Sequence, residues 1–130
     1  MNWRDAALGS AGIIGCGVAV AHGVLTQRFM IKPFARISDG RLAAPIRRLV
    51  PGLLHFSTFN WFLGGLALIV AAIGLGRDAR LAICVLVGSS YLYGALGNLW
   101  ATRGRHPGWA LYAIALALIV VGVGVGKSGG

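Results

Sequence analysis

No charged side chain interrupts four long apolar stretches of this chain, which lie between clusters of lysine, arginine and aspartate. A helix needs about 20 mostly apolar residues to cross the hydrocarbon core of a bilayer, and a charge at its centre costs roughly 2.5–3.5 kcal/mol on insertion scales. The pattern therefore predicts an all-α fold, an integral membrane four-helix bundle. The predicted spans cover residues 6–27, 50–76, 81–102 and 107–126.

The residues outside these spans are too few to form a soluble domain with a core of its own. We therefore interpret residues 1–130 as a single transmembrane domain. The net charge of +9 could suggest nucleic acid as a partner, but the chain is 57% hydrophobic. In such a chain, basic residues are explained by lipid phosphates and by membrane topology. We expect membrane lipids, and no nucleic acid, as partners.

Basic residues are concentrated in two of the three predicted connections. The first and third connections carry Arg28, Lys32, Arg36, Arg41, Arg47, Arg48, Arg103 and Arg105. The opposite side of the predicted bundle carries Arg4, Arg77, Arg80 and Lys127. Because cytoplasmic loops of membrane proteins are enriched in lysine and arginine, the split predicts that the first and third connections lie in the cytoplasm and both termini outside it. In a bacterial inner (cytoplasmic) membrane, the outside is the periplasm.

The first connection, residues 28–48, is longer than a helical hairpin needs. Apolar residues alternate irregularly with its cations, and Pro33 and Pro45 flank a turn at residues 38–40. This pattern favours an interfacial segment whose apolar side chains enter the headgroup boundary, with a solvated loop as the alternative. The side chains predicted to contact lipid headgroups are Arg28, Lys32, Arg36, Arg41, Arg47 and Arg48.

Polar residues within the spans gather toward the predicted cytoplasmic face, and they include all three histidines. At 100° per residue, His22 continues a stripe of small residues at positions 11, 15 and 19, which is the type of face that packs against another helix. We expect its imidazole to lie between helices near Asn98. The candidate ligand-binding residues are His22, His55, Asn60, Trp61, Asn98 and His106.

A second stripe of small residues follows Ser90, Gly94 and Gly97 in the third predicted span. Small residues let helix backbones approach closely in lipid. Stripes on more than one helix favour helix contacts beyond a single bundle. We therefore expect a homo-oligomer or a subunit of a larger membrane complex.

The polar residues give little support to catalysis. The three aspartates lie outside the spans and the chain has no glutamate, so a serine, a histidine and an acid cannot be assembled in one half of the membrane. We expect no enzymatic activity and no cofactor. A haem or a transition metal stays an alternative, because neutral imidazole is a common metal ligand and His22, His55 and His106 are predicted at one membrane face.

Short motifs surround these histidines. They are His22-Gly23-Val24-Leu25 with Arg28 and Pro33-Phe34, His55 with Trp61, and Arg103-Gly104-Arg105-His106 with Trp109. In these motifs the chain resembles an uncharacterised family of short bacterial four-span membrane proteins. The resemblance implies an inner-membrane location and a shared polar cluster on the cytoplasmic side, and it assigns no reaction.

These features together predict a small membrane protein that acts as a non-enzymatic binding or accessory subunit. The first alternative is a small channel or transporter entered from the polar cluster at the cytoplasmic face. The second alternative is a haem- or metal-binding membrane protein.

Overall fold

The computed structural model describes residues 2–124, and this part of the chain is helical with short connections. The elements are α1 (Trp3–Thr26), the π-helical segment η1 (Gln27–Ile31), α2 (Lys32–Ser38), α3 (Ala44–Gly74), α4 (Arg77–Thr102) and α5 (Gly108–Val123). Three continuous helices are long and apolar enough to cross a membrane: Trp3–Ser38, Ala44–Gly74 and Arg77–Thr102. The fourth apolar helix, α5, is shorter, and the last two residues of the predicted span 107–126 lie outside the described residues.

The first helix begins at a capping box. The Asn2 side chain accepts hydrogen bonds from the backbone N–H groups of Arg4 and Asp5, both at 3.0 Å, and the Asp5 carboxylate accepts from the Asn2 N–H at 3.2 Å. These bonds satisfy backbone donors that have no partner within the helix. The capping box therefore defines the start of α1 at Trp3.

The structure differs from the prediction of a separate interfacial segment at residues 28–48. The first helix continues without a break through η1 and α2 to Ser38, and only residues 39–43 connect it to α3. Pro33 lacks an N–H group and would clash with the preceding turn of a regular helix. The wide turn of η1, in which the Lys32 N–H bonds to the Gln27 carbonyl, directly precedes this proline and accommodates it. The chain reverses at Gly40, whose φ of +73° suits glycine.

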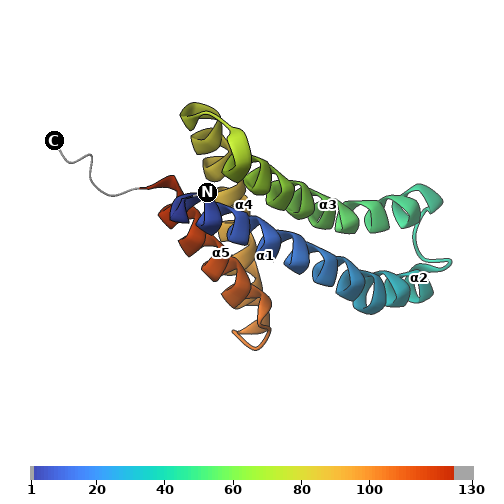
Figure 1. Cartoon of the computed structure of the whole chain (residues 1–130). Coiled ribbons are helices and arrows are strands. Elements are labelled where there is room, and N and C mark those ends of the chain that lie inside the picture. The colour runs from blue at the N-terminus through green and yellow to red at the C-terminus, as the bar shows by residue number, and fades with distance from the viewer. Residues whose placement is uncertain (1, 125–130) are drawn as a thin grey trace.

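The helices pack as two antiparallel pairs. Helix α1 lies beside α3, α4 lies beside α5, and further contacts join α1 to α5 and α3 to α4 (Figure 1). Figure 1 also shows that the α4–α5 pair crosses the α1–α3 pair at an angle, so the turn between α4 and α5 lies away from α2. The buried core contains Leu8, Ala11, Ala19, Trp61, Leu68, Cys84, Val87, Tyr91, Ala95, Tyr112, Ala115 and Ile119.

Small residues make the contacts between helices possible. A methyl group added at Gly12 would lie 2.5 Å from the Gly65 carbonyl oxygen, and one added at Gly15 would overlap the Tyr91 hydroxyl. The predicted stripe of α1 at positions 11, 15 and 19 is buried. The second predicted stripe holds only in part, because Gly94 is buried against Trp61, whereas Gly97 is exposed and no atom would lie within 4 Å of a methyl group added there. Gly94 thus makes a helix contact within one chain and gives no support to a contact between chains. The oligomer stays a prediction.

An ion pair closes one end of the bundle. Arg80, at the start of α4, donates to the Asp5 carboxylate at 2.7 Å, and the two side chains are only 21% and 17% exposed. The guanidinium of Arg80 lowers the pKa of the Asp5 carboxyl below its usual value, with a smaller contribution from the Asn2 backbone. At the same end, Leu8 and the Arg4 carbonyl lie against Gly122 of α5. The two helix pairs are therefore joined where α1 begins.

Apolar side chains cover the outer surface of the bundle. Ile73, Leu86, Tyr93 and Trp100 are between 72% and 84% exposed. Extended exposed apolar surface is unusual for a protein surrounded by water and marks a surface covered by lipid or by another protein. The outer surface thus agrees with helices that are long enough to cross a membrane.

Candidate functional site

An open groove of about 600 Å³ lies between the second half of α1 with η1 on one side and the α4–α5 turn on the other. Its apolar wall includes Val18, Leu25, Phe29, Met30 and Leu111. Its polar residues are His22, Thr26, Asn98, Thr102, His106 and Tyr112. The groove occupies the side of the bundle where the two helix pairs diverge in Figure 1.

His22 lies at the back of this groove, half-buried between α1 and α3. Its Nε2 atom is 3.2 Å from Thr26 Oγ1 and 3.4 Å from Ser57 Oγ, within hydrogen-bond distance of both hydroxyls. The imidazole meets the Trp61 ring edge to face, with 4.7 Å between ring centroids. These contacts hold the ring in place and occupy the nitrogen that faces α3.

A row of aromatic rings continues from His22 into the core. Trp61 contacts Tyr112 at 5.1 Å between centroids, and Tyr112 contacts Tyr91 at 5.1 Å. The Tyr91 hydroxyl donates to the Trp61 carbonyl at 3.5 Å. The buried Tyr112 hydroxyl has no hydrogen-bond partner among the described residues. Since an unpaired buried hydroxyl destabilises a fold, this group beside the groove is an unusual feature.

The end of the groove near the α4–α5 turn carries free hydrogen-bonding capacity. Asn98 Nδ2 donates to the Gly94 carbonyl at 2.9 Å, and no described residue donates to the Asn98 side-chain oxygen. His106 Nδ1 accepts from the Gly108 N–H at 3.0 Å. A neutral His106 therefore carries its proton on Nε2. This end of the groove thus offers one acceptor and one donor to a bound molecule.

The sequence candidates are not all brought together. His22, Asn98 and His106 line the groove, and Trp61 lies behind His22. His55 belongs to α3 and lies in a different pocket, beside Gly23 and Gln27 of the first helix. Its Nε2 atom is 3.0 Å from Gln27 Oε1. Asn60 lies between α3 and α4 and donates to Ser90 Oγ at 3.4 Å. Within residues 2–124, no three histidine, cysteine or acidic side chains are close enough together to hold a metal ion.

Sequence reasoning missed three residues that shape the groove. Tyr112 is a polar aromatic residue within a uniformly apolar run, and this contrast was a usable signal because buried tyrosines usually need a hydrogen-bond partner. Phe29 and Met30 belong to the segment that was assigned to the membrane interface. Their place in the groove wall follows from the continuation of the first helix through η1.

Comparisons with protein-family models, with curated proteins and with solved structures found no match to this chain. The short motifs around the histidines therefore gain no support from a wider likeness. The groove and the chemistry of the residues that line it are therefore the features of this chain that bear on function.

Proposed function

We propose that this protein is a four-span protein of the bacterial cytoplasmic membrane, with both termini in the periplasm. Three long apolar helices, a fourth shorter one and an apolar outer surface support the membrane location. Eight cations lie on one side of the bundle, six between Arg28 and Arg48 around the α2–α3 connection and two, Arg103 and Arg105, near the α4–α5 turn, and their excess supports the orientation.

Reporter fusions test this orientation. Alkaline phosphatase is active only outside the cytoplasm, so a fusion after Lys127 should be active and a fusion at Gly40 should be inactive in a bacterial host. The reason is that the connection at Gly40 is flanked by six cations, which are retained on the cytoplasmic side. An inactive fusion after Lys127 together with an active one at Gly40 would reverse the orientation.

Within this membrane protein, we propose that the groove binds one single-chain amphiphile, so that the protein acts as a non-enzymatic binding subunit. The observation that carries the proposal is the division of one groove into a long apolar wall and a polar end. Its volume of about 600 Å³ lies within the usual range of small-molecule sites, roughly 300–1,000 Å³. An acyl chain fits the wall formed by Val18, Leu25 and Leu111. A hydroxyl or protonated carboxyl head donates to Asn98 Oδ1 and accepts from His106 Nε2, whereas an ionised carboxylate accepts from His106 only.

A groove-filling substitution tests this function. Ala21 is exposed and lines the groove, so the phenyl ring of Ala21→Phe occupies the space of the acyl chain. Purified protein in a maltoside detergent should bind about one equivalent of radiolabelled palmitate, and Ala21→Phe should weaken this binding about tenfold or more, since several methylenes lose their contacts at about 0.8 kcal/mol each. Native mass spectrometry should show the same loss.

The matched control is Ala113→Phe, because Ala113 is exposed on α5 and lies outside the groove lining. It should bind palmitate like the unchanged protein. Equal binding by both variants would contradict the proposal. The cofactor alternative has its own test. If the purified protein carries one equivalent of haem or metal and His22→Gln removes it, the groove binds a cofactor and not an amphiphile, because an amide is a poor substitute for imidazole as a metal ligand.

A further inference from the structure

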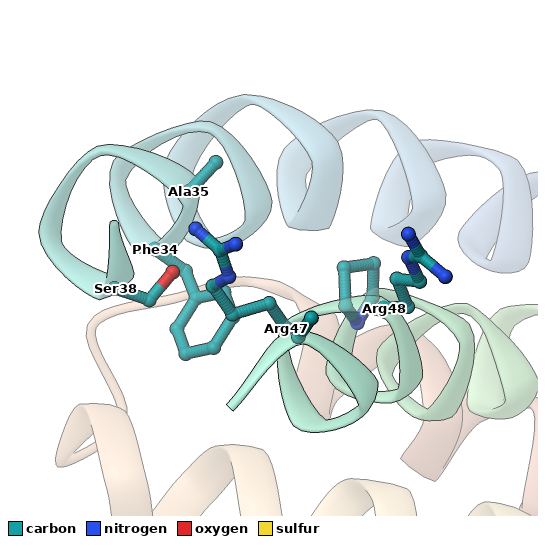
Figure 2. Close-up of a pocket in the computed structure, with 7 residues that line it drawn as sticks. Phe34, Ala35, Ser38, Arg47 and Arg48 are labelled. Carbon is teal, nitrogen blue, oxygen red and sulfur yellow. The ribbon is translucent and has the colours of Figure 1, made fainter. Parts of the chain in front are cut away.

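A second pocket, separate from the groove, lies at the corner where α2 meets the start of α3 (Figure 2). It has a volume of about 230 Å³ and is lined by Phe34, Ser38, Arg47, Arg48 and Pro51 among others. The corner is remote from His22 and Asn98, which line the other pocket. Its chemistry is therefore independent of the amphiphile groove.

Ser38 carries the first observation. The residue is only 4% exposed, and its hydroxyl is buried without a hydrogen-bond partner among the described residues. A serine in the last turn of a helix commonly bonds back to the carbonyl four residues earlier. Here the hydroxyl makes no such bond, and Figure 2 shows it directed toward the side of the pocket where the Arg47 guanidinium lies. The pocket thus contains a buried donor with no acceptor supplied by the described chain.

The charges around Ser38 are mainly positive. Arg47 donates one hydrogen bond to Asp39 at 2.5 Å and keeps its other donors, whereas Arg48 has no carboxylate partner among the described residues. The Asp39 carboxylate is 81% exposed, so solvent screens its repulsion of a bound anion. Two guanidinium groups and one exposed carboxylate leave a net positive charge at the pocket.

The start of α3 adds to this charge. Ala44, the first residue of α3, lines the pocket, and its cap residue Ala43 makes no side-chain hydrogen bond to the helix. The helix is 31 residues long and directs the positive end of its dipole toward this corner. A positive dipole end favours phosphate at helix N-termini. The Ala44 N–H is the backbone donor left there, because Pro45 has no N–H and the Ile46 and Arg47 N–H groups bond to the Ala43 carbonyl.

We propose that this corner is a binding site for a phosphate group. The Ser38 hydroxyl donates to one phosphate oxygen, and the guanidinium groups of Arg47 and Arg48 neutralise the charge, which guanidinium does well because its planar donors match phosphate geometry. The headgroup contacts predicted from the sequence involve six separate cations. The proposal goes beyond them, because it names one pocket and adds Ser38 as a residue that binds the phosphate. The phosphate belongs either to an anionic phospholipid or to a free phosphate compound.

The depth of the corner makes both sources relevant. Ser38 lies eleven residues beyond Gln27, where the predicted first span ends, and a helix rises about 1.5 Å per residue. The corner thus lies about 16 Å beyond the predicted span along the helix axis, whereas the headgroup layer is roughly 5–8 Å thick. Soluble phosphates reach a corner at this level directly, and lipid phosphates reach it where the helix is tilted toward the membrane surface.

Two probes distinguish the sources. Delipidated protein in a maltoside detergent is titrated with inorganic phosphate in one arm and with short-chain phosphatidylglycerol in the other, and binding is followed by calorimetry. Binding of inorganic phosphate assigns the site to free phosphate compounds, and binding of phosphatidylglycerol alone assigns it to lipid headgroups. The proposal fails if neither probe binds.

Variants locate the binding. Ser38→Ala and Arg48→Gln should each weaken the binding of the active probe about tenfold, because hydrogen bonds to charged groups are among the strong ones. Arg105→Gln removes the same charge at an exposed residue of the α4–α5 turn and should change binding by less than about twofold, since distant exposed charges are screened. Equal losses in all three variants would show a general charge effect and overturn the site.

The melting temperature separates a lost site from a damaged fold. Without phosphate, Ser38→Ala should be at least as stable as the unchanged protein, because it removes an unpaired buried hydroxyl. With the active probe at a concentration near the Kd of the unchanged protein, the unchanged protein and Arg105→Gln should gain stability, and Ser38→Ala and Arg48→Gln should gain much less. A gain of the same size in Ser38→Ala and in Arg48→Gln would overturn the proposal.

Discussion

Gly65→Leu is expected to separate α1 from α3 and to destabilise the protein strongly. A methyl group at Gly65 would lie 2.7 Å from the Gly12 carbonyl oxygen and 2.8 Å from the Cys16 backbone nitrogen. These are backbone atoms of α1, so they cannot retreat unless the whole helix moves. Overpacking of this kind costs about 1–3 kcal/mol and occasionally more, and the separation also removes the dispersion contacts that hold helices together in lipid.

The measurement is the free energy of unfolding in detergent, with the melting temperature alongside. The matched control is Gly52→Leu on the same helix, because Gly52 is exposed and no atom lies within 4 Å of an added methyl group. Leucine favours the helix by about 0.5–1 kcal/mol over glycine, so the control should be neutral or slightly more stable. Equal melting temperatures for the two variants would show that α1 and α3 do not cross at Gly12 and Gly65.

Trp61→Ala is expected to have the second large effect. Trp61 is 9% exposed, and its ring contacts His22 of α1 and Tyr112 of α5 and lies close to Gly94 of α4. It thus joins all four helices at one level. Replacing a buried tryptophan by alanine costs about 3–5 kcal/mol, because contacts are lost and the cavity closes only in part.

Trp100→Ala is the control for this substitution. Trp100 belongs to α4 and is 84% exposed, so its removal should change the free energy of unfolding by less than about 0.5 kcal/mol. Chemical denaturation in detergent measures both variants under the same conditions. A similar loss in both variants would mean that Trp61 is not a core residue.

Charge spacing is a good predictor of the helices but a poor one of where they end. The predicted span 81–102 lies within α4 and ends where this helix ends, but α4 begins earlier, at Arg77. It ended the first helix at residue 27 because Arg28 follows there, whereas backbone hydrogen bonding continues to Ser38. A positively charged side chain ends an apolar run without ending a helix, and its long stem reaches the membrane surface while the backbone stays helical.

The candidate site was predictable only where it depended on one helix. The position of His22 on a small-residue stripe follows from helical periodicity, and its half-buried place between α1 and α3 agrees with it. The groove instead depends on the angle at which α4 and α5 cross α1 and α3, and no local pattern encodes that angle. The crossing angle also explains Gly97. Its spacing of three residues from Gly94 predicted a helix contact, but in the structure Gly97 is exposed.

The Asp5–Arg80 pair has a mechanical consequence for the groove. It fastens the two helix pairs where α1 begins, while the α4–α5 turn lies at the opposite, divergent end. Because the pKa of Asp5 lies below its usual value, the stabilisation from this pair is complete at neutral pH and is lost only as the pH falls below about 4. Trp61 joins the same helices further along, so the two pairs are held together at Asp5 and again at Trp61, and they diverge beyond it. A change in the angle between the pairs would therefore change the groove width most near His106, at the end opposite Asp5.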